Sequence, residues 1–469
     1  MTRRVAIIGA GVIGGGWAAR FLLSGWEVRV FDTDPGAERR LGEVLENARR
    51  ALPGLSDRPM PPEGALSFHA TLSETVAGAD WIQESLPERL ELKRKIYQKI
   101  QAHCREDAVI ASSSGFTPSA LQGCATRPAQ ILVAHPFDPV YLLPLVELSA
   151  SPANPPELAA RAGEVLQGLG MFPLHVAAEG HGQIADRLQG ALWREALDLV
   201  RLGIATPRQI DEAIRMGPGL RWAQMGPFET CRVAAGEAGI RDFVARLGGS
   251  AEASGPADEL AERRAGPPGA PPVGELRRVR DTTLVALMRA LKWADRGAGA
   301  HLNRVDAARQ EPEPDITRPI VTTGHAVPLD WTDYNGHMNE SRYLKAFSDA
   351  SDRFMEIAGV DADYLASGGS FFTVETHLRH LREVKAGAPM RVETTLLGAG
   401  DKTMHLFHQM YSGETLLATG EQMLLHVSLE TRRAAPPAPH IAERLAGIAA
   451  AHAALPRPKG VGRAVGQGR

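Results

Sequence analysis

Short apolar runs alternate with helical patterns over the first part of the chain, from Val5 to about residue 178. The runs are rich in branched residues and read VAIIG, EVRVFD, WIQES, AVIASSS, QILVAHP and PLHVA. Alternation of this kind predicts βαβ units, and therefore a mostly parallel sheet with helices on both faces. We expect a doubly wound α/β domain here.

The pattern then becomes helical. Leucine and alanine recur at spacings of three and four over residues 186–247, and ELRRVRDTTLVALMRALKWAD predicts a helix at about 275–295. Between them, residues 249–274 are rich in Gly, Ala and Pro and predict a surface loop. Residues 296–316, ending in EPEPD, predict a weakly structured joint.

From Arg318 the pattern changes again. A strand, PIVTTGHAV, precedes a long helix at about 340–358, and β-rich runs follow: FFTVETHLRHLREV, MRVETTLLGAG, TMHLFHQMYS and LLATGEQMLLHVSL. One helix with a series of antiparallel strands is an α+β arrangement. The stretch from Arg433, with an Ala-rich helix and a basic Gly/Pro tail, predicts a loosely held terminus. The chain is thus divided into residues 1–184, 185–298, 299–317, 318–432 and 433–469.

Composition limits the class of protein. A length of 469 residues fits two or three domains, and a net charge of −3 argues against a nucleic-acid or anionic membrane surface. Cys104, Cys124 and Cys231 lie far apart, which predicts reduced thiols in a cytoplasmic protein, with neither disulfides nor a metal site. No apolar run reaches the roughly 20 residues of a membrane span. Glycines break the N-terminal apolar run, which favours a first strand over a signal peptide.

The N-terminal motif predicts a dinucleotide site. GAGVIG, at Gly9–Gly14, follows a predicted strand and precedes a predicted helix. Gly9 permits the tight turn, Gly11 lets a pyrophosphate approach the backbone, and Gly14 allows the helix to lie against the strand. Asp32 follows about 20 residues later, where a carboxylate binds the ribose diol and repels a 2′-phosphate, so NAD is favoured over NADP. Further NAD contacts are expected from Ala10, Val12, Ile13, Glu88, Lys93 and Ser112.

Longer stretches identify a family. IQESLPERLELK, ASSSGFTPSAL, AHPFDPVYLLPLVEL and GPGLRWAQMGPFET make residues 1 to about 295 resemble the 3-hydroxyacyl-CoA dehydrogenase superfamily. Within it, the segment is similar to the lambda-crystallin/L-gulonate 3-dehydrogenase branch and to L-carnitine dehydrogenases, the latter in YLLPLVE, DRLQGALWREAL and LRWAQMG. The resemblance implies an NAD-dependent 3-hydroxy acid dehydrogenase that dimerises through its helical domain.

Three side chains are expected to carry the redox chemistry. His135 follows the apolar strand QILVA, at the carboxyl end where such sheets bind ligands, and an imidazole there can take the hydroxyl proton. The resemblance places Glu147 on the other ring nitrogen, and Ser114 is expected to bind the reacting oxygen. Alternatively, His135 is a turn histidine and Ser114 a helix N-cap.

Two departures from the fatty-acyl members bear on the substrate. These members carry Asn where this chain has Asp138 and Asp186, and carboxylates suit a cation better than a fatty-acyl thioester. Carnitine has a quaternary ammonium group, which aromatic faces attract. We therefore expect these acids to form a cradle for the cation with Phe137, Tyr141, Trp193 and Trp222. Alternatively, these aromatic residues form the core of a dimer interface.

The C-terminal domain carries a second active-site motif, Asp330–Asn339, which reads DWTDYNGHMN. With its surroundings, this loop resembles the 4-hydroxybenzoyl-CoA thioesterase family, whose fold is the hotdog. The resemblance implies that Asp333 activates water or attacks the thioester, while backbone N–H groups near Gly336 to Asn339 stabilise the oxyanion. His337 and Asn339 are expected to orient the substrate; alternatively, Asp333 and Asn339 only cap the turn and helix.

Together, the two resemblances favour carnitine breakdown, in which L-carnitine is oxidised to 3-dehydrocarnitine and betainyl-CoA is later hydrolysed to glycine betaine. Two other readings remain open. One is a 3-hydroxyacyl-CoA or L-gulonate dehydrogenase fused to a general acyl-CoA thioesterase. The other is a binding or structural protein with a silent acyl-CoA sensor. We expect small-molecule substrates and a homodimer or higher homo-oligomer, with neither nucleic acid nor membrane as partner.

Overall fold

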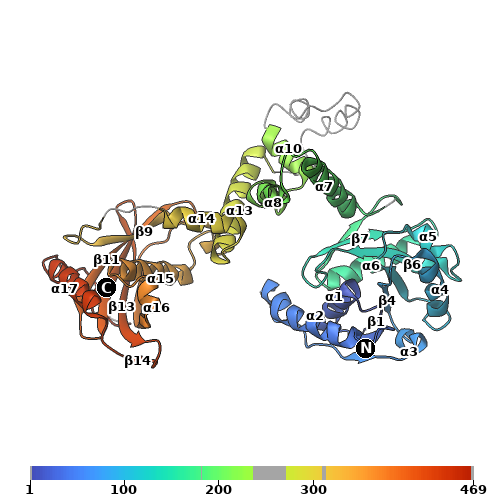
Figure 1. Cartoon of the computed structure of the whole chain (residues 1–469), viewed down its shortest axis with the longest axis horizontal. Coiled ribbons are helices and arrows are strands. Elements are labelled where there is room, and N and C mark those ends of the chain that lie inside the picture. The colour runs from blue at the N-terminus through green and yellow to red at the C-terminus, as the bar shows by residue number, and fades with distance from the viewer. Residues whose placement is uncertain (1–2, 57, 181, 236–270, 309–312, 466–469) are drawn as a thin grey trace. The chain divides into compact units, whose positions relative to one another are not determined.

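The computed structural model describes residues 3–56, 58–180, 182–235, 271–308 and 313–465. It divides into two compact units, Met1–Ile204 and Ala205–Arg469, and each is described by itself (Figure 1). Most of the loop predicted over residues 249–274 lies outside the described residues.

The first unit is built on an eight-stranded sheet of order β3-β2-β1-β4-β5-β6-β7-β8. Neighbouring strands are parallel except β6 and β7, which are antiparallel. The strands are β1 (Arg4–Ile8), β2 (Glu27–Phe31), β3 (Leu66–Phe68), β4 (Trp81–Glu84), β5 (Val109–Ser112), β6 (Ile131–Pro136), β7 (Leu145–Ser149) and β8 (Phe172–His175). The predicted, mostly parallel α/β sheet is confirmed.

Two separate cores cover the two faces of this sheet. Val5 and Ile7 belong to one cluster, which includes α1, α2 and α6. Ala6 and Ile8 belong to the other, which includes α3, α4 and α5. Successive residues of a strand point to opposite faces, so β1 is buried on both, which explains its unbroken apolar run. The helices are α1 (Val12–Leu23), α2 (Ala37–Ala51), α3 (Leu72–Val76), α4 (Leu90–Gln101), α5 (Pro118–Gln122), α6 (Pro156–Gly168) and α7 (Ile184–Arg201), with 3-10 turns η1 (Leu52–Leu55) and η2 (Pro128–Gln130).

The second unit begins with helices. They are α8 (Pro207–Met216), α9 (Pro218–Trp222), α10 (Pro227–Ala235), α13 (Val273–Trp293) and α14 (Gly297–Ala307). The helix predicted at about 275–295 is confirmed as α13, but the weakly structured joint predicted over residues 296–316 is wrong, because α14 occupies half of it. Its glycines suggested a linker. Instead, Gly299 lies so close to α13 that a Cβ would sit 2.0 Å from the Leu291 carbonyl carbon.

The rest of the second unit is an antiparallel sheet of order β10-β13-β12-β11-β9, with β14 on β13. Its long helix α15 packs through Phe347 against Gly420 of β13, where any side chain would clash with the ring. This confirms the predicted α+β domain. The elements are β9 (Ile320–Ala326), η5 (Leu329–Trp331), α15 (Glu340–Ile357), α16 (Ala362–Ala366), β10 (Gly369–His380), β11 (Pro389–Ala399), β12 (Thr403–Ser412), β13 (Thr415–Ser428), β14 (Arg433–Ala434) and α17 (Pro439–Ala453).

The helix α17 is part of this domain's core, so the prediction of a loosely held terminus is wrong for it. Ile441, Leu445 and Ile448 are buried in one cluster with residues of the sheet. His452 Nδ1 accepts the Leu396 N–H of β11 at 2.9 Å, beside a bulge in that strand. Alanine-rich composition suggested a mobile tail, but three apolar residues spaced at four and three suffice to bury one face.

A buried histidine joins α15 to the sheet. His408 of β12 is fully buried, and its Nε2 and Nδ1 lie 3.0 Å from Ser351 Oγ and 2.9 Å from Thr394 Oγ1. The Ser351 hydroxyl donates to Gln422 Oε1 at 2.6 Å, and the Phe347 ring stacks on the imidazole. Burial lowers the pKa of His408 from 6.5 to about 4, so the folded protein holds this ring neutral.

This burial predicts an acid-sensitive domain. Below pH 6.5 the unfolded chain binds a proton at His408 that the folded chain refuses down to about pH 4. The free energy of unfolding therefore falls by as much as about 3 kcal/mol across that window and is restored as the pH rises. Hydrogen exchange of β12 amides, corrected for intrinsic rates, should show this loss in the wild type and a smaller one in His408→Asn. In His440→Gln, a change at an exposed histidine of α17, the loss should be as in the wild type. Equal pH dependence in the wild type and His408→Asn would contradict the prediction.

Candidate active sites

The glycine loop has the geometry that the motif predicts. Gly9 ends the turn after β1 with φ of +89°, where a Cβ would meet the Ser85 carbonyl oxygen at 2.9 Å. A Cβ on Gly14 would lie 1.8 Å from the Gly9 carbonyl oxygen, so only glycine lets α1 start this close to the strand. Gly11 has nothing within 4 Å of its Cβ position, which leaves that side open to a ligand.

A carboxylate lies beside this loop. Asp32 follows β2, and its Oδ2 accepts the Ala10 N–H at 2.6 Å while Oδ1 accepts the Asp34 N–H at 2.8 Å. The open face of Gly11, the N-terminus of α1 and this fixed carboxylate fit the pyrophosphate and ribose of NAD. Val12 is exposed beside them, whereas Ile13 packs against the core. Whether each residue touches NAD stays a prediction.

A buried ionic network lies under the ends of β4 and β5. Lys93 Nζ donates to Glu84 Oε1 at 2.8 Å, and both side chains are buried. The Ser112 hydroxyl and the Tyr97 hydroxyl each donate to Glu84 Oε2 at 2.6 Å. Burial, and then the charge of Glu84, raises the pKa of Tyr97 well above its ordinary value. Lys93 and Ser112, predicted as NAD contacts, thus have their polar atoms bound to Glu84. Sequence reasoning missed Glu84 and Tyr97, although Glu84 follows an apolar strand.

Ser114 is held by a second acid. Its hydroxyl donates to Glu88 Oε1 at 2.6 Å, and the same oxygen accepts the Gly115 N–H at 2.9 Å. Ser114 is itself buried and accepts the Phe116 N–H through its Oγ. Glu88, predicted as an NAD contact, therefore fixes the hydroxyl that was expected to bind the reacting oxygen.

The expected partner of His135 is replaced by another acid. His135 and Glu147 are directly opposite on β6 and β7, yet the Glu147 oxygens accept the N–H groups of Ile184 and Ala185 at 2.6 and 2.7 Å. His135 Nδ1 is buried without a hydrogen-bond partner in the part of the chain that the structure describes. Its Nε2 lies 3.1 Å from Asp186 Oδ2. The Glu147 bond expected for His135 is thus not made here, since the first turn of α7 takes that carboxylate.

The cradle residues are only partly brought together. Asp186 and Trp193 lie on α7, where Trp193 is 65% exposed. Tyr141 packs against the core of the first unit. Trp222 belongs to α9 of the second unit. Phe137 donates its N–H to the Leu145 carbonyl at 3.3 Å, and Asp138 beside it is exposed.

The thioesterase-like loop is a tight turn before α15. The Asp333 N–H donates to the His337 carbonyl at 2.9 Å, and Asp333 Oδ1 accepts the Asn335 N–H at 2.8 Å. Asn339 Oδ1 accepts the Ser341 N–H at 3.0 Å, so Asn339 is the N-cap of the helix. Gly336 has φ of +75°, as a turn of this shape requires. The capping alternative is therefore present, and it uses Oδ1, whereas Asp333 Oδ2 makes no hydrogen bond to the described residues.

Two absences among the described residues bear on the site. Across the described residues, no group of three or more His, Cys, Asp or Glu side chains is arranged to hold a metal ion. In the same part of the chain, no helix has the length and apolar character needed to cross a membrane.

Known proteins match both halves of the chain. The family model for the NAD binding domain of 3-hydroxyacyl-CoA dehydrogenase matches residues 4–179, that for the C-terminal domain matches 182–264, and the thioesterase-like superfamily matches 327–445. These matches confirm the predicted Rossmann, helical and hotdog domains.

Whole proteins match as well. A Ruegeria pomeroyi protein named L-carnitine dehydrogenase/betainyl-CoA thioesterase is 59% identical over 481 residues, which is 98% of each chain. One of the same name from Agrobacterium fabrum is 47% identical over 93% of each chain. An L-carnitine dehydrogenase of Pseudomonas putida is 44% identical over 61% of this chain and 93% of its own.

The position of Glu147 predicts the effect of its neutral isostere. Glu147→Gln keeps one oxygen for the N-terminus of α7 and turns an amide N–H toward the other donor. We expect faster hydrogen exchange at Ile184 and Ala185 and about a tenfold fall in kcat for NAD reduction. Glu179→Gln is the matched control, because Glu179 caps Ser119 of α5 in the same way. If kcat falls while exchange at α7 is unchanged, Glu147 acts on His135 directly instead.

Proposed function

Because the chain belongs to the family of L-carnitine dehydrogenase/betainyl-CoA thioesterases, we propose that its first half oxidises L-carnitine to 3-dehydrocarnitine with NAD. We further propose that its hotdog domain hydrolyses betainyl-CoA to glycine betaine and CoA. The observation that carries the first activity is His135, at the carboxyl end of β6, with its Nε2 facing Asp186 at 3.1 Å. A base is thus present where doubly wound sheets bind their substrates.

The chemistry of the first site needs a general base, a group that binds the substrate oxygen and a hydride acceptor. The substrate hydroxyl would enter beside His135 Nε2 and Asp186, and Nε2 takes its proton as the carbonyl forms at the same carbon, because Nδ1 is buried. Ser114 donates to that oxygen once the substrate competes with Glu88 for its hydroxyl proton. When bound, NAD accepts the hydride. The Asp186 carboxylate then stabilises the imidazolium, the part expected of Glu147.

The substrate's cation fits the same turns of α7. Asp186 and Trp193 are seven residues apart, close to two turns, so they lie on one stripe of the helix. Gly190 lies between them, and a Cβ there would be 3.5 Å from Arg194 Nη1, so the Arg194 guanidinium lies over this glycine. Helical side chains lean toward the N-terminus, so the indole is expected to lean toward the turn that carries the carboxylate. A trimethylammonium group held there would contact an aromatic face and a negative charge together.

The second site needs a nucleophile or base and an oxyanion site. Asp333 Oδ2 is available to activate water or attack the thioester carbonyl. The N–H groups of Gly336, Met338 and Asn339 already donate to the carbonyls of Asp333, Val384 and Trp331, and that of Ser341 donates to the Asn339 side chain. The dipole of α15, rather than these N–H groups, would therefore stabilise the oxyanion. Gly336 and His337 line this turn, and His337 Nε2 lies 3.5 Å from Glu383 Oε1.

We also propose that the enzyme works as a homo-oligomer in the cytoplasm. The strand β10 lies at the end of its sheet and exposes Phe372 and Val374. A free, apolar edge of this kind is suited to pairing with a second copy. The scattered cysteines agree with a reducing compartment.

Reciprocal loss of activity tests the assignment of two sites. His135→Ala should lower kcat for NADH formation from L-carnitine by about 100-fold or more, because the general base is removed. CoA release from betainyl-CoA should be unchanged. Asp333→Asn should lower CoA release and leave NADH formation unchanged. Both activities are measured on the same preparations, by NADH absorbance and by thiol titration. Substantial CoA release by Asp333→Asn would refute the thioesterase assignment.

A substrate pair tests the cation cradle. The wild type should prefer L-carnitine over its neutral isostere, in which carbon replaces the ammonium nitrogen. Trp193→Ala should lower that ratio of kcat/KM values by up to about 30-fold, since the cation–π contact is lost. Trp293→Ala, a change at an exposed tryptophan of α13, is the control. An unchanged ratio in Trp193→Ala would remove the cradle from the proposal.

A further inference from the structure

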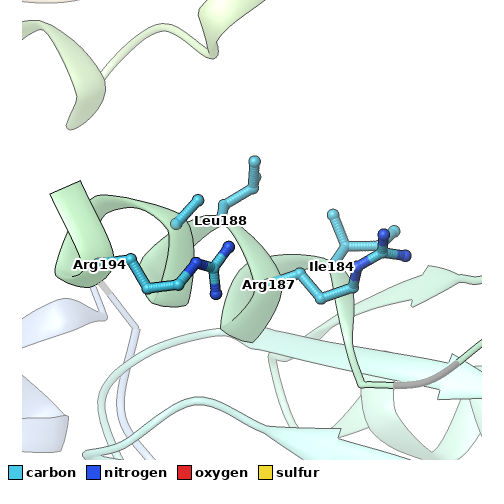
Figure 2. A pocket seen from close by; sticks show the side chains of 5 residues that line it. Ile184, Arg187, Leu188 and Arg194 are labelled. Atoms are coloured by element: carbon cyan, nitrogen blue, oxygen red, sulfur yellow. The ribbon is translucent and has the colours of Figure 1, made fainter.

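Two arginines lie on one flank of α7 around an open hollow. Arg187 and Arg194 line this hollow of about 420 Å³ together with the apolar side chains of Ile184, Leu188 and Ala191. Figure 2 shows that the two arginines extend in the same direction along the helix, with Arg194 reaching toward Arg187. The hollow thus combines an apolar floor with two guanidinium groups.

Neither guanidinium has a carboxylate partner within the described residues. In contrast, Arg201 at the end of the same helix pairs with Asp198, and Arg208 on the next helix pairs with Glu212. No ion pair between described residues neutralises the positive charge at the hollow, which therefore suits an anionic ligand.

The sequence of α7 explains this arrangement. Asp186-Arg187 and Trp193-Arg194 are two pairs separated by seven residues. Seven residues are close to two turns, so Asp186 and Trp193 share one stripe while Arg187 and Arg194 share a second, about 100° around the helix. One helix thereby presents an acidic and aromatic stripe beside a basic stripe.

The two stripes meet near the catalytic histidine. Asp186 lies 3.1 Å from His135 Nε2 and is bonded in sequence to Arg187. In L-carnitine, the carbon that carries the hydroxyl has the ammonium group on one side and a free carboxylate on the other. With the hydroxyl at His135 and the cation on the first stripe, the carboxylate is directed toward the second.

We propose that Arg187 and Arg194 form the binding site for the carboxylate of the substrate and so select a free 3-hydroxy acid. This assignment rests on the proposed oxidation of L-carnitine. Guanidinium groups match a planar carboxylate in both charge and geometry. A thioester or amide at the same carbon carries no negative charge and loses that attraction. The arginine pair therefore selects a free carboxylate, while the aromatic stripe selects the ammonium group at the other end of the substrate.

The experiment compares L-carnitine with L-carnitinamide, which keeps the hydroxyl and ammonium groups but lacks the carboxylate charge. Steady-state NAD reduction is measured with the full chain for the wild type, Arg187→Gln and Arg194→Gln. We expect KM for L-carnitine to rise about 10- to 100-fold in each variant. Since only binding is lost, kcat should change little, and kinetics with the amide should stay as in the wild type. Arg194→Lys should regain part of the affinity.

Arg201→Gln is the matched control, because it removes a guanidinium from the same helix and should leave both substrates unaffected. Equal losses for L-carnitine and its amide in Arg187→Gln and Arg194→Gln would show a general effect on α7 and overturn the assignment. An unchanged KM for L-carnitine in both variants would overturn it as well, with the proposed oxidation intact. A wild type that reduces no NAD with L-carnitine would instead refute the proposed function and, with it, this site.

Discussion

The contact between the Glu147 carboxylate and the first turn of α7 is the constraint on which the dehydrogenase site depends. Glu147 is buried on β7, and its two oxygens accept the first two N–H groups of the helix. A buried carboxylate is stable only with such partners, and the partial positive charge of the helix N-terminus adds to them. None of the residues of α7 is buried, so this cap is a main support for its position. Because Asp186 is the third residue of that helix, the cap also delivers the acid that faces His135.

The same principle recurs beneath the nucleotide loop. Glu84 is buried at the end of β4 and is satisfied by Lys93, Tyr97 and Ser112, which come from α4 and β5. Removing one member would leave a buried charge or hydroxyl without a partner, at a cost well above that of a surface ion pair. The network therefore fixes the strand ends that carry Ser85 and Ser114. Glu88 does the same for the Ser114 hydroxyl. In this unit, acids at the carboxyl ends of strands mostly position other groups.

Much of this could be predicted from the sequence, and the reasons differ by element. The apolar runs predicted the parallel sheet because strands buried on both faces read as continuous apolar segments. The glycine loop was predictable because Gly9 and Gly14 exclude any other residue and Gly11 leaves its side open to a ligand. The partner of Glu147 was not, since it depends on where a helix 37 residues later begins. Likewise, α14 was missed, and the helix of α17 was predicted without its packing, because glycine and alanine, which are typical of linkers, also let helices pack closely.

Each of the two units exposes an apolar surface, and the two surfaces together constrain the symmetry of any oligomer. The helix α7 leaves Leu192, Leu197 and Val200 exposed, and the edge strand β10 leaves Phe372 and Val374 exposed. Each surface has the apolar character that self-association covers. If both surfaces pair with a second copy, one closed dimer forms only when the two twofold axes coincide. If they do not, each chain contacts two different neighbours, and the assembly grows until a larger ring or cage closes. In either case, the outcome would depend on two apolar surfaces of one chain and not on either surface alone.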